Sequence, residues 1–125
     1  MKEYKVKVFE DKTVWYNLEG QLHREDGPAR EYADGTKKWY RNGQLHREDG
    51  PAIERSNGDK YWYRDGQFHR EDGPALEYAS GTKVWYIEGN QLTESEFNSR
   101  NKSELTMGQI AEKFNIPVES LKIKK

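Results

Sequence analysis

The chain has 125 residues and a formal net charge of −1, so it has room for one domain and no overall basic field for a nucleic-acid backbone. Cysteine is absent, which excludes disulfides and thiolate metal sites, and no apolar run reaches the roughly 18 residues of a membrane span. Charged residues make up 34% and aromatic residues 13%, which favours a thin ordered structure over disorder. These features predict a cytoplasmic protein without a membrane segment.

Residues 4–20 are predicted to form a hairpin that is a degraded copy of the units that follow. Val6 and Val8 precede the turn at Asp11, and Trp15 and Tyr16 follow it. End units of repeat proteins are atypical because one side has no equivalent neighbour. The first strand, residues 4–9, is therefore expected to have an open edge through which a second copy of the chain can pair.

The rest of the chain is organised around an eight-residue signature that is written three times. It reads Leu-His-Arg-Glu-Asp-Gly-Pro-Ala at residues 22–29 and 45–52, and it returns at residues 68–75 with Phe first. His23, His46 and His69 are therefore spaced by 23 residues. A fixed period of this length indicates a repeat architecture.

Two classes of turn alternate between the signatures. Asp34-Gly35, Asn57-Gly58 and Ser80-Gly81 are predicted to be two-residue hairpin turns, the first two of type I′. Asn42-Gly43, Asp65-Gly66 and Glu88-Gly89 reverse the chain into the next signature or its replacement. Regular alternation predicts an all-β fold, a single-sheet antiparallel meander of 23-residue β-hairpin repeats with a small helical C-terminal cap.

Turn position also predicts the register and the two sides of the sheet. Two-residue loops place Arg30 opposite Trp39, Ile53 opposite Trp62 and Leu76 opposite Trp85. Alternation then puts the tryptophans with Val8, Ile53 and Leu76 on one side, which is the predicted packed side. The tyrosines lie on the other side with Ala29, Ala52, Ala75, Glu31 and Lys38.

After the last turn the pattern changes, and three segments are predicted. Residues 1–97 form the repeat domain, ending in a short helix that starts near Leu92. Residues 98–104 are polar and predicted to be a linker. Residues 105–125 are predicted to be a helical segment whose capping box is formed by Thr106 and Gln109.

The turn-and-signature pattern and the 23-residue period resemble the MORN repeat and its MORN-variant relatives. The chain is closest to His-Arg-x-Asp-Gly-Pro-Ala repeats of phage, bacterial and large-virus proteins, over about residues 4–97. The resemblance implies stacked hairpins in one elongated sheet. It also implies binding rather than chemistry, because MORN repeats are linked to membrane and protein contacts and bacterial MORN-variant proteins are proposed antitoxins.

The repeated histidines and arginines invite a reading as chemical sites. Equivalent residues two strands apart lie roughly 9.5 Å from each other, whereas Zn–N bonds are about 2 Å long, so the histidines are predicted to be structural and no metal or cofactor is expected. Arg24, Arg47 and Arg70 could bind phosphates, but local pairing with the acidic residues that follow is favoured. A repeated set without a distinct nucleophile does not indicate an enzyme.

The predicted partner-binding residues are Tyr40, Tyr63 and Tyr86, with Arg24, Arg47 and Arg70 at the signature corners as the second choice. Tyrosine is enriched at protein interfaces, although these rings could equally serve only to cover the sheet. The prediction is a non-enzymatic protein-binding module, encoded by a phage or mobile element, that inhibits or sequesters a host protein. The alternative is nucleotide or nucleic-acid binding through the arginine and aromatic rows, and a hydrolase is a distant third.

Overall fold

The computed structural model describes residues 4–106, with side chains described up to residue 100. It divides into two compact units, Met1–Gln91 and Leu92–Lys125. Within the described residues the first unit is β throughout and the second contains one helix, so the predicted all-β hairpin repeat with a helical C-terminal cap is confirmed.

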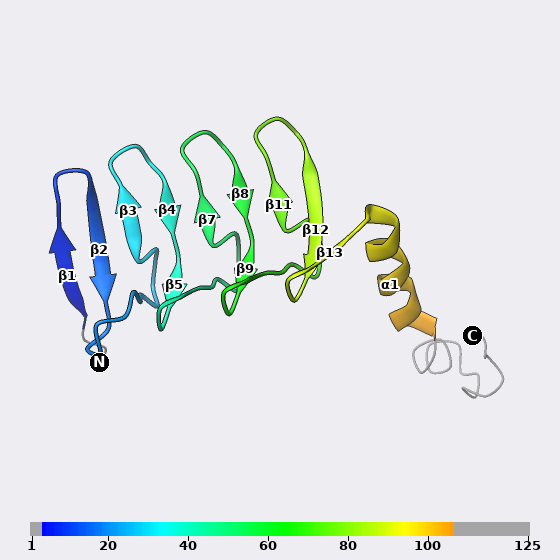
Figure 1. Ribbon diagram of the computed structural model, residues 1–125, viewed down its shortest axis with the longest axis horizontal. Coiled ribbons are helices and arrows are strands. Elements are labelled where there is room, and N and C mark those ends of the chain that lie inside the picture. Colours follow the sequence, from blue (N-terminus) through cyan, green and yellow to red (C-terminus); the bar gives the residue numbers. More distant parts are fainter. Residues whose placement is uncertain (1–3, 107–125) are drawn as a thin grey trace. The chain divides into compact units, whose positions relative to one another are not determined.

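The first unit is one antiparallel sheet with small ribbons below it (Figure 1). In the described residues the sheet has nine strands in the order β1-β2-β3-β4-β7-β8-β11-β12-β13, so neighbours in space are neighbours along the chain except where a ribbon intervenes. The ribbons are β5-β6 and β9-β10. The strands are β1 (Lys5–Val8), β2 (Lys12–Tyr16), β3 (Arg30–Tyr32), β4 (Lys37–Lys38), β5 (Tyr40–Arg41), β6 (Gln44–Leu45), β7 (Ile53–Glu54), β8 (Lys60–Tyr61), β9 (Tyr63–Arg64), β10 (Gln67–Phe68), β11 (Leu76–Glu77), β12 (Lys83–Ile87) and β13 (Asn90–Leu92).

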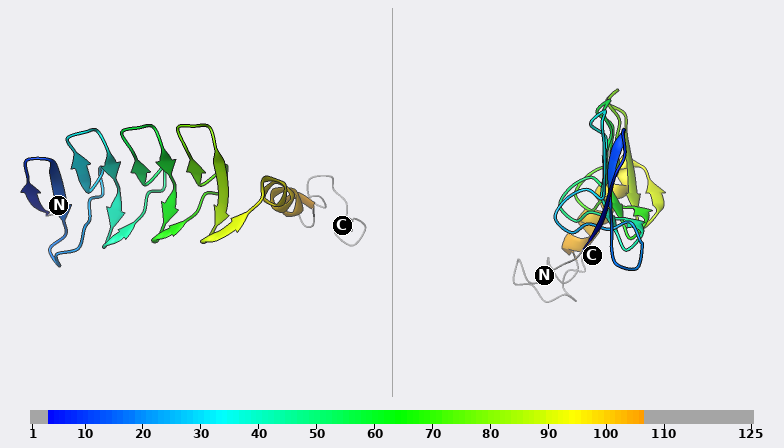
Figure 2. Two further views of the ribbon diagram at one scale, coloured as in Figure 1. Left: turned by 45° about the horizontal axis from the view of Figure 1, so that its top comes forward. Right: turned by 90° about the vertical axis from the view of Figure 1, so that its left-hand side faces the viewer.

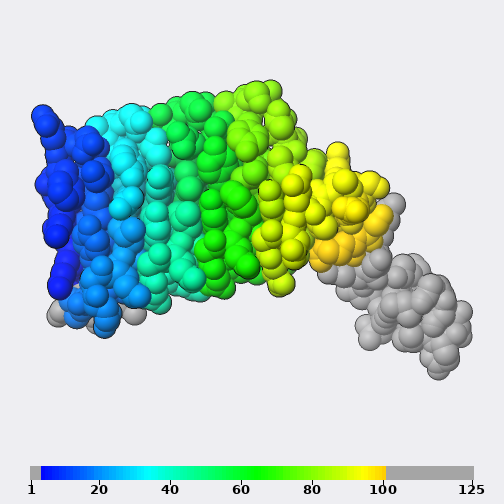
Figure 3. Space-filling view, in the orientation of Figure 1, coloured from blue at the N-terminus to red at the C-terminus, as the bar shows by residue number. Residues whose placement is uncertain are grey.

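The hairpins repeat side by side, as the left view of Figure 2 and the successive bands of Figure 3 show. The tryptophan of each unit joins neighbours through its backbone. Trp39 N–H donates to the carbonyl of Ala52 (2.7 Å), and its own carbonyl accepts from His46 N–H (3.1 Å). In the two central units the strand is interrupted at Trp39 or Trp62, where it leaves the main sheet and enters the lower ribbon, whereas β2 and β12 continue through Trp15 and Trp85.

The two turn classes have different geometries from those predicted. The upper loops of the three signature units contain three residues, not two, because Tyr32 N–H bonds to Thr36 O (2.9 Å) around residues 33–35, and Arg55 and Tyr78 bond in the same way to Asp59 and Thr82. In the upper loops only the glycine has a positive φ, which is 99° at Gly35. The type I′ conformation belongs to the lower turns, where both central residues have positive φ, as at Asn42 (50°) and Gly43 (85°).

The extra loop residue shifts the register by one position, so the predicted register is wrong. Arg30 lies opposite Lys38, Ile53 opposite Tyr61 and Leu76 opposite Val84. In the first hairpin Val6, not Val8, lies opposite Trp15. Since a shift of one residue exchanges the two faces of one strand relative to its partner, Ile53 and Leu76 do not share a face with the tryptophans.

We name the two faces by their aromatic residues. The Tyr face carries the register row of Lys7, Val14, Arg30, Lys38, Ile53, Tyr61, Leu76 and Val84. The Trp face carries the tryptophans and the register row of Thr13, Glu31, Lys37, Glu54, Lys60, Glu77 and Lys83. The predicted association of Ala29 and Glu31 with the tyrosines is likewise wrong, because both belong to the Trp face.

Few side chains of this sheet are buried, as expected for a single layer. The buried apolar residues of the first unit are Val14, Ala29, Ala52, Ile53, Ala75 and Leu76. The three alanines of this set have no exposed surface. All four tryptophans are half-buried, so the Trp face is not a closed apolar core.

The second unit contains α1 (Glu94–Thr106). A capping box starts it, because Thr93 Oγ1 accepts from Glu96 N–H (3.0 Å) and Glu96 Oε1 accepts from Thr93 N–H (2.9 Å). Residues 98–104, predicted to be a linker, are helical, since the helix that begins at Glu94 continues through them. The predicted helical segment at 105–125 lies outside the described residues from position 107 on. Within the described part, no helix is long and apolar enough to cross a membrane.

Candidate functional site

Each signature arginine lies over the tryptophan ring of its own corner. The Cζ atom of Arg47 is 3.7 Å from the centroid of the Trp39 ring, and the distances are 3.9 Å for Arg24 over Trp15 and 3.8 Å for Arg70 over Trp62. On the other side of Arg47 lies Gly50, where an added Cβ would come within 2.9 Å of Cζ. The glycine of the signature is therefore required by the close approach of the guanidinium to the backbone.

The same guanidinium is held in its plane by hydrogen bonds. Arg47 Nε donates to Asp49 (3.0 Å), and Nη1 donates to the Pro51 carbonyl (3.1 Å) and to Glu54 (3.0 Å). Arg70 repeats this pattern, and Arg24 repeats it with a longer distance of 3.6 Å to Glu31. The predicted local pairing of the arginines is confirmed, and their side chains keep only 21–22% of their surface exposed.

Each signature histidine joins its repeat to the next one. The Nδ1 atom of His46 accepts from the backbone N–H of Asp65 (3.0 Å), which belongs to the lower turn of the following unit. An accepting Nδ1 carries no proton, so the proton of the neutral ring lies on Nε2, which is 3.2 Å from a Glu48 oxygen. His23 and His69 repeat both contacts, and all three histidine residues are only 6–7% exposed.

The histidines thus have a structural role, in which they link each repeat to the next. Both ring nitrogens already have partners inside the protein, which leaves neither for a ligand or for proton transfer with a substrate. Among the residues that the structure describes, no group of three His, Cys, Asp or Glu side chains could hold a metal ion.

Two equivalent polar grooves lie between successive signature corners. Their volumes are about 830 Å³ for the groove of Arg24 and Arg47 and about 610 Å³ for the groove of Arg47 and Arg70. Exposed carboxylates line both, including Asp49 and Asp72, each with 87% of its side chain exposed. Carboxylates at least match the cations in number, so these grooves do not present a basic surface to a phosphate.

The tyrosines predicted to bind a partner lie together on the Tyr face. The ring centroids of Tyr63 and Phe68 are 4.5 Å apart, and those of Phe68 and Tyr86 are 4.9 Å apart, which forms an aromatic stripe across two units. Burial raises the pKa of Tyr63, and its neighbours Tyr40 and Tyr78 raise it further. Burial likewise raises the pKa of Tyr40. These rings are half-buried, with no second sheet over them in the described residues of the first unit.

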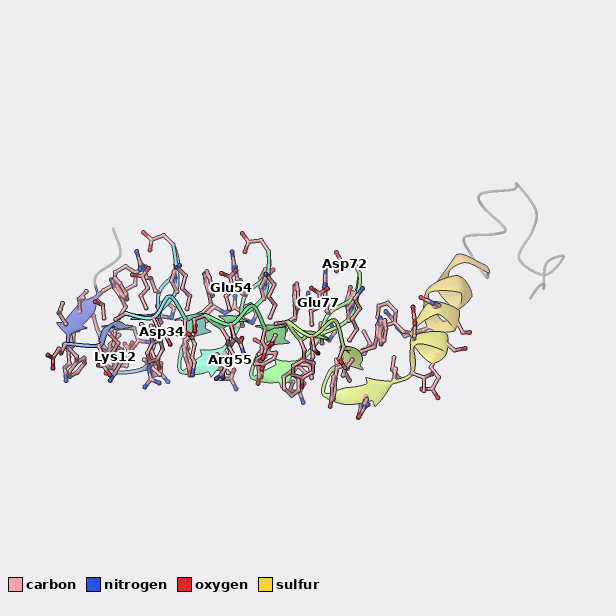
Figure 4. All side chains as sticks on the ribbon, turned by 90° about the horizontal axis from the view of Figure 1, so that it is seen from above. Lys12, Asp34, Glu54, Arg55, Asp72 and Glu77 are labelled. Atoms are coloured by element: carbon pink, nitrogen blue, oxygen red, sulfur yellow. The ribbon has the colours of Figure 1, made fainter. Side chains whose placement is uncertain are left out.

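The charges of the two faces differ, and the sequence prediction missed this difference. On the Trp face acids and bases alternate across the register row, from Glu31 and Lys37 to Glu77 and Lys83. On strands β1–β4 the Tyr face carries five cations and no acid: Lys5, Lys7, Lys12, Arg30 and Lys38. In Figure 4 the labelled Lys12 and Arg55 lie on one side of the sheet, and the labelled Glu54, Glu77 and Asp72 lie on the other.

The side chains of the two predicted sets of binding residues lie on different faces, but the two sets meet at the grooves, which Tyr40 and Tyr63 line together with the signature arginines. Tyr40, Tyr63 and Tyr86 lie on the Tyr face, whereas the signature arginines lie on the Trp face. The signal that could have revealed the cationic Tyr face is the alternation of Lys5 and Lys7 with valines, followed by Arg30 and Lys38 in register.

Comparison of the chain with protein-family models, with curated proteins and with solved structures found no match. The resemblance to MORN-like repeats therefore stays a prediction that rests on the sequence pattern, and the geometry of the site carries the functional argument.

Proposed function

We propose that this protein is a non-enzymatic, MORN-like binding module whose Tyr face docks a protein partner. One observation carries the proposal: the signature histidines and arginines, which could otherwise take part in chemistry, are bonded within the stack. The Tyr face, in contrast, is a half-exposed aromatic surface. Arg47 and His46 illustrate the first part, because Nε and Nη1 of Arg47 and both ring nitrogens of His46 have partners in their own or the next repeat. Tyrosines supply large, rigid contact area with a polar tip, which suits protein interfaces.

The biological setting follows from the family resemblance. Signatures of this kind resemble those of phage and bacterial proteins, so the proposed role is that of a phage or mobile-element accessory protein in the host cytoplasm. It would inhibit or sequester a host protein by covering its surface. A repeated sheet fits this role because it offers a long, regular contact surface.

The alternative function, nucleotide or nucleic-acid binding through Arg24, Arg47 and Arg70, is less well supported. Their Nε and Nη1 atoms donate to carboxylates and carbonyls of the same corner, so a phosphate would have to displace these acceptors. Binding to phosphates would weaken steeply with added salt, whereas an aromatic protein interface would depend on salt far less.

The test is a pull-down from bacterial lysate with the full chain as bait. Wild type is compared with the triple variant Tyr40→Ala, Tyr63→Ala, Tyr86→Ala and with a Trp-face control, Lys60→Gln, Lys83→Gln. We expect wild type and the control to retain a stoichiometric protein that the triple variant loses.

Folding of each bait is checked by circular dichroism, because half-buried rings contribute to stability. If the triple variant unfolds, the single variants Tyr40→Ala and Tyr86→Ala replace it. Retention of the same protein by every folded Tyr-face variant would contradict the proposal, and recovery of nucleic acid alone would support the alternative.

A further inference from the structure

The cations of the Tyr face gather in its N-terminal half, on adjacent strands. Lys5 and Lys7 lie on β1, Arg30 on β3 and Lys38 on β4. Within the described residues none of these four forms an ion pair with a carboxylate, in contrast to the signature arginines. A net charge of −1 for the whole chain therefore hides a local excess of positive charge on one face.

Arg30 shows that this excess is costly to the folded protein. Its Nε is buried without a hydrogen-bond acceptor in the described structure, and its Nη1 has only the long contact to the Tyr32 hydroxyl (3.4 Å). A buried donor without an acceptor destabilises the fold, and a half-buried guanidinium without an anion does so further. An anionic group supplied by a partner would offset the second of these costs, the uncompensated charge of the guanidinium.

The cations also lie against the faces of the neighbouring aromatic rings. Lys7 is 5.5 Å from the centroid of Tyr16, Lys38 is 5.5 Å from that of Tyr32, and Arg30 is 5.8 Å from that of Tyr40. A nucleobase stacks on an open ring face, and here the nearby ring faces are already occupied by cations. The arrangement is suited to carboxylates that meet the cations rather than to bases that stack.

We propose that the N-terminal half of the Tyr face, formed by Lys5, Lys7, Arg30 and Lys38 with Tyr32 and Tyr40, recognises an acidic protein segment. This inference rests on the proposed function and specifies the chemistry of the partner. Carboxylates of the partner pair with the four cations, and its apolar atoms pack on the tyrosine rings. The charge of the face is complementary to such a segment and repels a basic one.

The inference is tested by fluorescence anisotropy with labelled poly-glutamate peptide, oligothymidylate of matched length and poly-lysine as probes. We expect wild type to bind poly-glutamate more tightly than oligothymidylate and not to bind poly-lysine. The variant Lys7→Gln, Lys38→Gln should bind poly-glutamate about fivefold more weakly, because two surface charge pairs are lost.

The matched control is Lys60→Gln, Lys83→Gln, which removes the same charge from exposed positions of the Trp face. It should bind poly-glutamate as wild type does. An equal loss in both variants would overturn the inference, since the binding would then follow net charge alone. Tighter binding of oligothymidylate than of poly-glutamate would overturn it in favour of a nucleic-acid partner.

Failure of the inference is separable from failure of the proposed function. The variant Lys7→Gln, Lys38→Gln is also used as bait in the lysate experiment. If it retains the protein that the tyrosine variants lose, the Tyr face still docks a protein but does not select it by acidic charge.

Discussion

Both faces of this sheet place cations over aromatic rings, but the surroundings of these cations differ between the faces. On the Trp face each signature arginine is held in place: Arg47 lies over Trp39 and close to Gly50, and it is bonded to Asp49 and Glu54. On the Tyr face cations also lie over aromatic rings, but those on β1, β3 and β4 have no carboxylate partners in the described structure. Whether a cation over a ring is structural or available therefore depends on its carboxylate partners and not on its residue type.

The largest expected effect concerns the bonds of the Trp face that cross between repeats. His46→Ala removes the acceptor of Asp65 N–H and leaves a cavity at a position that is 6% exposed. We expect a loss of about 3 kcal/mol in the free energy of unfolding, measured by urea denaturation. Glu48→Gln is the control and should cost less than about 1 kcal/mol, because Glu48 is exposed. An unchanged midpoint for His46→Ala would show that the histidine does not hold the repeats together.

A smaller loss in the free energy of unfolding is expected when the space for the Arg47 guanidinium is reduced. Gly50→Ala places a Cβ within 2.9 Å of Arg47 Cζ and should cost about 1–3 kcal/mol, because the guanidinium must leave the tryptophan or its acceptors. The double-mutant cycle with Arg47→Ala isolates this clash. In the Arg47→Ala background Gly50→Ala should be close to neutral, and equal losses in both backgrounds would place the strain elsewhere.

A still smaller and pH-dependent effect is expected at Asp59, an acid that precedes β8 beside the Tyr face. Its pKa is lowered chiefly because the carboxylate accepts from the backbone N–H of Ala79 in the next unit (2.7 Å), and also by the Tyr61 hydroxyl and Asn57. A lowered pKa stabilises the fold above the unfolded value of 3.8, and this stability is lost as the pH falls through the folded pKa. Asp59→Asn should therefore be less stable than wild type at neutral pH in thermal unfolding. The two proteins should converge in acid, and a difference independent of pH would contradict this origin.

The smallest effect is expected for the available cations. Lys7→Gln, Lys38→Gln should change the free energy of unfolding by no more than about 0.5 kcal/mol, because neither lysine has an ion pair to lose within the described residues. Calorimetric unfolding of this variant beside wild type measures the effect. A large loss would assign these lysines to the structure and remove the distinction between the two faces.

Much of the fold could be predicted from the sequence because period and turn residues carry strong local signals. The 23-residue spacing and the glycine turns at Gly35 and Gly43 predict a meander of hairpins, and the meander is present. The register could not be predicted, since Asp34-Gly35 fits both a two-residue turn and the end of a three-residue loop. One residue of loop length decides which side chains share a face.

The same ambiguity limited the prediction of the site. The structural role of the histidines and the local pairing of the arginines follow from their repetition and from the acids beside them. The grouping of Arg30 with Lys7 and Lys38 does not, because it depends on the register of strands far apart in the chain. The continuous helix through residues 98–104 was missed because its residues are polar and the apolar signal is weak.

The histidine contacts make the stack directional. Each ring binds the backbone of the following unit, 19 residues further on, and Leu92 stands 23 residues after His69, where the next histidine would be. Each unit therefore bonds through its histidine to the unit after it, and the first and last units differ from those between them. A further 23-residue unit inserted in its middle would find its bonding partners on both sides and lengthen the sheet by two strands, roughly 9.6 Å. The number of units thus sets the length of the sheet, and neither end has to change when a unit is added.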